Sequence, residues 1–151
     1  MSLNEDKPKK VLVIGIGNPL RSDDGVGPYI ADSVEAKGLS NVKVWVTQQL
    51  NMEDLERMLD FDRVILADAS LDGPLLDFHP VEKSVGQALS SSHHLSAEMF
   101  VSLASSIYHK DLRMHLCSLK GNTFEVGDKI SPDVLLRAQE AVELICCSLQ
   151  G

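Results

Sequence analysis

The sequence predicts an α/β fold with three layers (α/β/α), in which helices flank a twisted, mostly parallel, five-stranded sheet. Residues 11–17 and 63–67 are almost wholly apolar, which is typical of strands that are buried on both faces of a parallel sheet. Segments whose apolar residues recur at helical spacing alternate with such strands along the chain. This alternation favours a three-layer α/β protein over an all-helical or all-strand one.

The first half of the chain supplies three strands and two helices. Residues 11–17 (VLVIGIG) form the first strand, and 25–37 form a helix because their apolar residues recur every three or four positions. Residues 42–47 (VKVWVT) alternate between apolar and other side chains, as a strand does, and 52–59 carry a short helical stripe. The third strand, 63–67 (RVILA), is apolar and ends directly before an aspartate.

The second half of the chain adds two strands and two helices. Residues 75–81 (LLDFHPV) are predicted as a strand, and 86–94 as a serine-rich loop. A helix over 95–108 follows, because it carries an apolar stripe, and 111–119 form the last strand. The final helix runs from the Ser-Pro pair at 131–132 to about residue 148, since serine is a good cap and proline is favoured in a first turn.

Composition and charge restrict the classes of partner. The chain has 151 residues, of which 44% are hydrophobic and 24% charged, and we expect a flexible tail over 1–10 and a single domain over 11–151. A formal net charge of −8 argues against nucleic acid and anionic membranes, and suits metal cations or a basic docking surface. Without a secretory signal, an apolar run of about 20 residues or a disulfide-like cysteine pattern, the sequence predicts a cytoplasmic protein.

Acidic residues follow two of the predicted strands. Asp23 and Asp24 lie in the loop after the first strand, and Asp68 ends the third. Ligands of open parallel sheets bind beyond the carboxyl ends of the strands, so we expect these acids at one edge. A histidine from the pair His93 and His94 would complete a set of two carboxylates and one imidazole. Such a set suits divalent nickel, zinc, manganese or cadmium and leaves coordination positions open.

Each of these residues also has a structural interpretation, which the spacing leaves open. Asp23 or Asp24 could cap a helix, and Asp68 could form a turn. His93 and His94 could be surface residues of a loop. The other histidines stand in no recognisable constellation, and we expect structural or surface roles for them: His79, His109 and His115.

Three sequence motifs resemble those of the hydrogenase maturation endopeptidases. Residues 15–27 (GIGNPLRSDDGVG) resemble the N-terminal signature of that family, G-x-G-N-x-L-x-x-D-D/E-x-x-G. Residues 66–69 (LADA) resemble its strand-end A-D-A, and 92–95 (SHHL) resemble its H-x-L/M element. The resemblance spans about residues 10–148. Many members have a Gly-Gly-Thr-like turn after the second strand, where this chain has Thr47-Gln48-Gln49-Leu50. We interpret this difference as related to which hydrogenase the enzyme processes, and not to the reaction itself.

The resemblance implies an α/β protease that removes a C-terminal extension from the large-subunit precursor of a NiFe-hydrogenase after nickel is installed. By position, it implies that Asp24, Asp68 and His93 are both metal-binding and catalytic; His94 is a neighbouring candidate for the histidine. The substrate would supply the nickel, although cadmium or zinc can fit the same ligands. We expect a monomer, because the enzyme must embrace a large folded partner. For cleavage, the sequence leaves two routes open: the metal polarises the scissile carbonyl group or activates water, or one carboxylate acts as general base on that water.

Two rival functions remain. A nucleotide-binding domain would fit the strand, glycine-rich loop and helix, but Leu20 stands where the third glycine of G-x-G-x-x-G belongs. A non-catalytic docking module for hydrogenase maturation would use the same metal contacts without cutting. Common protease signatures such as H-E-x-x-H and G-x-S-x-G are missing, so the prediction of a protease depends on the family resemblance.

Overall fold

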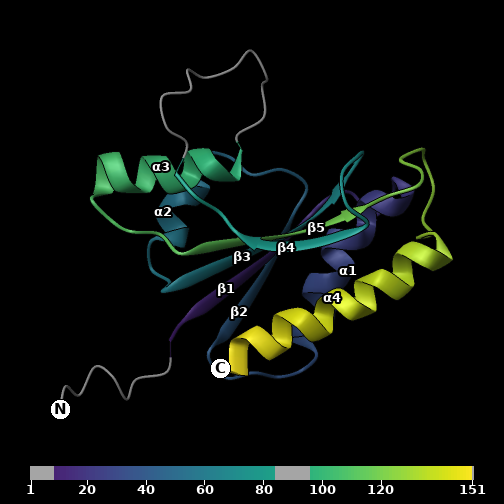
Figure 1. Ribbon diagram of the computed structural model, residues 1–151, viewed down its shortest axis with the longest axis horizontal. Coiled ribbons are helices and arrows are strands. Elements are labelled where there is room, and N and C mark those ends of the chain that lie inside the picture. The colour runs from purple at the N-terminus through teal and green to yellow at the C-terminus, as the bar shows by residue number, and fades with distance from the viewer. Residues whose placement is uncertain (1–8, 84–95, 151) are drawn as a thin grey trace.

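The computed structural model describes residues 9–83 and 96–150, which build a sheet with helices on both faces (Figure 1). Within these ranges, the strands are β1 (Val11–Ile16), β2 (Val42–Thr47), β3 (Arg63–Ser70), β4 (Leu76–Pro80) and β5 (Met114–Lys120). The helical elements are the 3-10 turn η2 (Ser22–Gly25), α1 (Val26–Glu35), α2 (Asp54–Met58), α3 (Ala97–Tyr108) and α4 (Pro132–Gln150). The strand order is β2-β1-β3-β5-β4. All neighbours are parallel except β4, which runs antiparallel to β5 at one edge.

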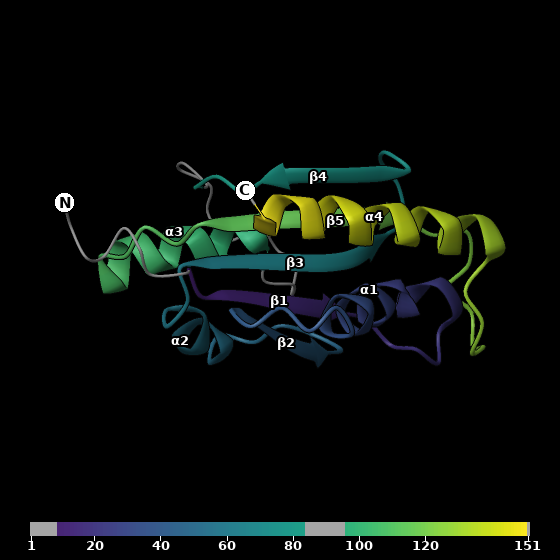
Figure 2. The ribbon, with the colours of Figure 1, turned by 90° about the horizontal axis from the view of Figure 1, so that it is seen from below.

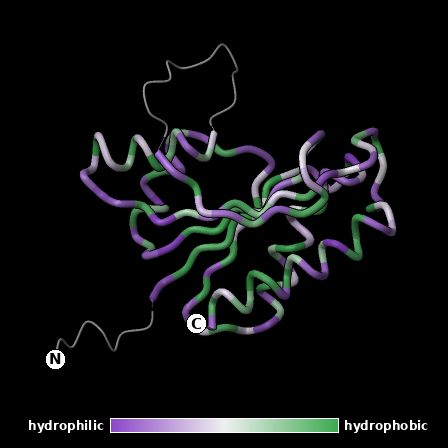
Figure 3. The backbone as a smooth tube through the Cα atoms, in the orientation of Figure 1, coloured by the Kyte–Doolittle hydropathy of each residue, from purple (hydrophilic) through white to green (hydrophobic). Residues whose placement is uncertain are grey.

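The sheet separates two apolar cores, because successive side chains of a strand point to opposite faces. Val11 and Val13 of β1 pack toward α1 and α4, whereas Leu12 and Ile14 pack toward α2 and α3. Figure 2 shows α1 and α4 on the near face of the sheet, and in Figure 3 the central strands are mostly hydrophobic. The predicted α/β fold with a mostly parallel five-stranded sheet is therefore confirmed.

Several boundaries differ from those that the sequence predicts. The third strand continues past residue 67 to Ser70, so Asp68 lies within β3 and not after it. It continues because β5 pairs with it as far as Ser70 and Lys120 and supplies backbone hydrogen-bond partners. β5 begins at Met114, later than predicted, and α2 spans Asp54–Met58 only. The predicted loop 86–94 and most of the tail 1–10 lie outside the described residues.

The cysteines lie in regular elements. Cys117 is a buried residue of β5, and burial raises the pKa of its thiol to about 12. Cys146 is buried and Cys147 is exposed, both on α4, as expected for helix residues. In the part of the chain that the structure describes, no helix is both long and apolar enough to cross a membrane.

Two glycines bring the start of α1 against the ends of β1 and β3. A Cβ atom at Gly27 would lie 2.2 Å from the carbonyl oxygen of Ile16 and 2.6 Å from that of Ala67. A Cβ atom at Gly15 would lie 2.4 Å from the carbonyl oxygen of Gly27. These distances are shorter than any van der Waals contact, so only glycine permits this approach. The approach positions the turn η2, which carries the acidic residues of the first motif, beside β3.

Replacing Gly27 by alanine is therefore expected to destabilise the protein. The new methyl group meets backbone oxygens, which cannot rotate away, and we expect a loss of about 3 kcal/mol and a fall in melting temperature of roughly 10 °C. Thermal unfolding followed by circular dichroism measures it. Gly38→Ala is the control, since no atom lies within 4 Å of the added Cβ and only its positive φ of 68° opposes the change. Equal melting temperatures for the two variants would contradict the steric argument.

Candidate active site

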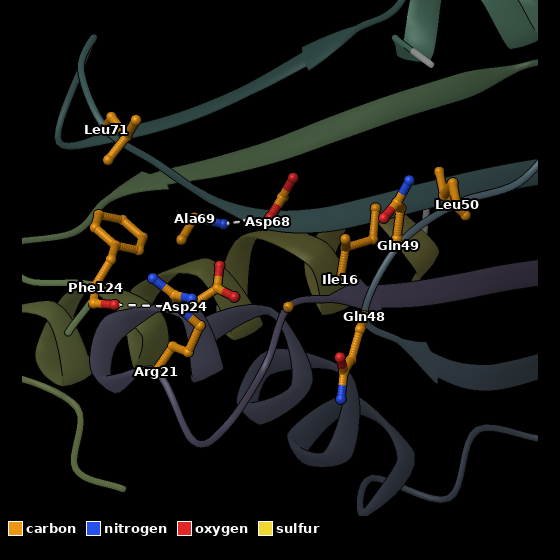
Figure 4. A pocket seen from close by; sticks show the side chains of 11 residues that line it. Ile16, Arg21, Asp24, Gln48, Gln49, Leu50, Asp68, Ala69, Leu71 and Phe124 are labelled. Atoms are coloured by element: carbon orange, nitrogen blue, oxygen red, sulfur yellow. Dashed lines mark hydrogen bonds between the residues drawn. The ribbon is translucent and has the colours of Figure 1, made fainter. Parts of the chain in front are cut away.

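A cavity of about 690 Å³ opens at the carboxyl ends of β1, β2 and β3 (Figure 4). Both acids that the sequence predicts as metal ligands, Asp24 and Asp68, line it. Its described lining comes from the end of β1, the turn η2, the segment after β2, the end of β3 and the loop 121–131: Ile16, Gly17, Arg21, Asp24, Gln48, Gln49, Leu50, Asp68, Ala69, Leu71 and Phe124. The expected meeting of the two strand-end acids at one sheet edge is thus observed.

Asp24 is held by the loop that precedes it. The backbone N–H of Asn18 donates to Asp24 Oδ2 at 2.8 Å. Gly17 makes this closure possible, because it has a φ of +145° and a Cβ atom there would lie 1.9 Å from the carbonyl oxygen of Asp24. The helix α1 has Gly25 at its N-cap and no side-chain cap bond, so the alternative that Asp24 caps the helix is wrong. The glycine-rich motif instead fixes one carboxylate at the cavity.

Asp68 has an altered acidity. Burial raises the pKa of its carboxyl group to about 7, and the negative charge of Asp24 adds to the increase, while the N–H of Ala69, which donates to Oδ1 at 2.8 Å, acts in the opposite direction. Near neutral pH both the protonated and the ionised form of Asp68 are therefore populated, which suits a general acid or base. Two carboxylates that repel each other in a partly buried cavity also fit a divalent cation, which would relieve the repulsion.

The raised pKa of Asp68 predicts a pH-dependent stability. The folded state holds the proton of Asp68 more tightly than the unfolded chain does. The protonated carboxyl group therefore adds to the free energy of unfolding, fully below pH 3.8, and this gain is lost as the pH rises to about 7. Asp68→Asn lacks this titration. We expect the stability of the wild-type protein relative to Asp68→Asn to fall between about pH 4 and pH 7 and to level off above it. Urea unfolding at four pH values measures the difference, and a constant difference would rule out the shifted pKa.

Asp23 has a different role from its neighbour. It is fully buried, does not line the cavity, and accepts hydrogen bonds from Asn122 N (2.7 Å), Thr123 N (3.2 Å), Ser131 N (2.6 Å) and Ser131 Oγ (2.9 Å). Burial by itself would raise the pKa of Asp23, but the bonds from Ser131, Asn122 and Thr123 lower it below the ordinary value of 3.8. Asp23 thus ties η2 to the loop 121–131 and does not cap the helix α1 that follows it in the sequence. The sequence gives no local signal of partners that lie about 100 residues away.

The loop 121–131 forms one wall of the cavity. Ser22 fixes it by two bonds, from its N–H to the carbonyl oxygen of Gly127 (2.8 Å) and from Oγ to that of Glu125 (2.7 Å). Arg21 Nε donates to the carbonyl oxygen of Phe124 at 3.2 Å (Figure 4). Sequence reasoning did not assign Arg21 or Phe124 to the site, because no pattern links the first motif to this loop. Gln48, Gln49 and Leu50, noted as a departure from the family, line the opposite part of the cavity.

The predicted histidine ligand is not placed. His93 and His94 lie outside the described residues, so a histidine ligand at this site stays a prediction. Across residues 9–83 and 96–150, no group of three or more histidine, cysteine, aspartate or glutamate side chains is close enough to hold a metal ion. The two carboxylates at the cavity are thus suitable cation ligands that require further donors from elsewhere.

The remaining histidines lie away from the cavity. His79 Nδ1 lies 3.1 Å from an oxygen of Asp77 in β4. His115 Nδ1 accepts a bond from Arg63 Nε at 3.3 Å, and His109 ends α3 in the left-handed conformation. None of the three lines the cavity that holds Asp24 and Asp68, in agreement with the structural or surface roles expected for them.

Solved structures of hydrogenase maturation proteases superimpose on nearly the whole chain. HycI from Thermococcus kodakarensis KOD1, a NiFe-hydrogenase maturation protease, is 21% identical with a TM-score of 0.73, over 97% of this chain and 96% of that one. The hydrogenase maturating endopeptidase HybD from E. coli is 19% identical with a TM-score of 0.69, over 93% and 92%. The chain has the hydrogenase maturation protease fold.

A third structure agrees at higher identity. The hydrogenase 2 maturation peptidase from Thaumarchaeota archaeon SCGC_AB-539-E09 is 27% identical, with a TM-score of 0.67 over 93% of this chain and 98% of that one. The resemblance to hydrogenase maturation proteases, predicted from three short motifs, is therefore confirmed. No family model and no curated protein matches this sequence.

Proposed function

We propose that this protein is an endopeptidase that removes the C-terminal extension from the nickel-loaded large-subunit precursor of a NiFe-hydrogenase. One observation carries the proposal: Asp24 and Asp68 line one cavity at the carboxyl ends of β1 and β3. They do so within a fold shared, over nearly its whole length, with proteases of hydrogenase maturation.

The nickel of the precursor is the feature that the enzyme recognises. Asp24 and Asp68 offer carboxylate oxygens to that ion, and His93 is the third ligand, with His94 as the alternative. In the free enzyme the charge of Asp24 contributes to the raised pKa of Asp68, and a cation between the two carboxylates removes this repulsion. A precursor without nickel cannot provide that gain, so it binds less well. Nickel is in this scheme part of the substrate, and cadmium or zinc can substitute at the same ligands.

Exposed apolar side chains beside the cavity suit a protein substrate. Leu71 lines the cavity and is 77% exposed. Val126, in the loop 121–131, is 90% exposed, and Leu20 is 65% exposed and lies next to it, since its carbonyl oxygen accepts a bond from Gly127 N. Exposed apolar side chains close to a cavity suit contact with a protein partner. A large folded precursor would cover all three.

Two routes of cleavage fit this site. The substrate's nickel can polarise the scissile carbonyl group or activate a water molecule. Alternatively, Asp68 takes a proton from the attacking water, a role for which a pKa near 7 is well matched. In both routes Asp24 and Asp68 act next to the bond that is cut.

Intact mass spectrometry of a precursor from the same source tests the function. Nickel-loaded and nickel-free precursors are each incubated with the protein. We expect the nickel-loaded precursor to lose a single C-terminal segment and the nickel-free one to keep its mass. A stable complex without any loss of mass would contradict the peptidase and indicate a docking module. Equal cleavage of both precursors would contradict recognition of nickel and leave the peptidase in place.

A further inference from the structure

We propose that Arg21 is a catalytic residue, which donates a hydrogen bond from its guanidinium group to the carbonyl oxygen of the bond that is cut. This inference rests on the proposed peptidase function. It adds a positively charged group to a site so far described by its acids.

The position of Arg21 is the first reason. Arg21 is the basic side chain among the described residues that line the cavity, and it shares the cavity with Asp24 and Asp68 (Figure 4). It nevertheless forms no ion pair within 4.0 Å with any described carboxylate, whereas Lys37, His79 and Arg137 each lie within that distance of an acidic side chain. An arginine that lies beside two acids and pairs with neither is available for a group that the substrate brings.

The second reason is that the guanidinium group is held in place before substrate arrives. Nε, the guanidinium nitrogen nearest the backbone, donates to the carbonyl oxygen of Phe124, while the two outer nitrogens have no bond to a described residue. The backbone of Arg21 is fixed as well, because its N–H donates to Asn18 O at 3.0 Å and its carbonyl oxygen accepts from Asp24 N at 3.1 Å. A parallel bridge joins Arg21 to Gly127 across the two segments. Fixed donors stabilise a developing charge better than donors that must first reorient.

The third reason is the charge that peptide hydrolysis creates. Water adds to the carbonyl carbon and gives one proton to a base of the site, and one electron pair of the C=O bond moves onto the oxygen. That pair returns when the C–N bond breaks, which leaves a carboxylate on one fragment and an amine, which takes up a proton, on the other. Asp24 and Asp68 are negative when ionised and disfavour another negative oxygen nearby. The positive charge of Arg21 offsets this effect at the carbonyl oxygen.

The alternative is that Arg21 only supports the loop 121–131 through its bond to Phe124. Ser22→Gly serves as the matched control, since it removes the adjacent bond from Ser22 Oγ to Glu125 O, suits the positive φ of 55° at this residue, and leaves the cation in place. Arg21→Ala and Arg21→Lys test the cation itself. For each variant we would measure the rate of tail removal at saturating nickel-loaded precursor and the affinity for that precursor. For Arg21→Ala the rate is measured again with free guanidinium ion added.

We expect Arg21→Ala to lower the saturated rate by about 10²- to 10³-fold, with affinity changed by no more than about 3-fold. Guanidinium ion should restore part of the rate, Arg21→Lys should lose less than Arg21→Ala, and Ser22→Gly should cleave nearly as fast as the wild type. A normal rate for Arg21→Ala, or an equal loss for Ser22→Gly, would overturn the proposal, as would a loss confined to affinity. A wild-type protein that leaves the precursor whole would overturn the peptidase function itself, and this result is distinct from all the others.

Discussion

Asp24→Asn and Asp68→Asn are each expected to lower the rate of tail removal by on the order of 10³-fold or more. Asparagine has nearly the same shape as aspartate but carries no charge and binds metal ions weakly. An asparagine at position 24 can still accept the bond from Asn18 N, so the loop that holds it is kept. The measurement is the rate of mass loss from nickel-loaded precursor, with each variant at the same concentration.

The matched control is Asp32→Asn, which removes an exposed carboxylate from α1 without touching the cavity. It should process the precursor at the wild-type rate. Both active-site variants should unfold within a few degrees of the wild type at neutral pH, since neither carboxylate supports the core. A variant that cleaves normally would remove its residue from the site. By the same reasoning His93→Ala should lose activity and His94→Ala should keep it, and the reverse result would move the ligand by one position.

Asp23→Ala is expected to cause the largest loss of stability. The buried carboxylate accepts bonds from three backbone N–H groups and one hydroxyl group, and the substitution leaves these donors without it. An unsatisfied buried donor costs about 1–3 kcal/mol, so we expect a total of roughly 4 kcal/mol and a melting temperature lower by about 10 °C. Differential scanning calorimetry measures the change. The loop 121–131 should also become more accessible, which limited proteolysis can detect.

Asp128→Ala provides the comparison, because Asp128 is exposed in the same loop. It should unfold like the wild type. The lowered pKa of Asp23 also sets the pH range of the effect, since its contribution to stability is present above pH 3.8 and is lost as the pH falls through the folded-state pKa. The difference between the wild type and Asp23→Ala should therefore shrink below pH 3.8. A difference that persists in acid would show that the carboxylate is not the stabilising group.

The two neighbouring acids show how far sequence reasoning reached. The positions of the acids at the ends of parallel strands predicted that they meet at one edge of the sheet. The motif resemblance selected Asp24 and Asp68, and both line the cavity. Asp23 and Asp24 look alike in sequence, and the interpretation of Asp23 as a helix cap was wrong. The structure separates them by burial, because Asp23 faces donors of the loop 121–131 while Asp24 faces the cavity.

By itself, the sequence determined the sheet, its parallel strands and the edge at which the acids meet. Apolar runs and helical stripes are local patterns, and the ends of parallel strands share one side of a sheet whatever the loops do. Three features were decided only by the tertiary structure. The loop 121–131 contributes to the cavity wall, and β3 extends through Asp68 because β5 pairs with it. Arg21 lines the same cavity as the acids without an ion pair to them. These features depend on contacts between segments about 50 to 100 residues apart, which are set by packing and leave no periodic pattern in the chain.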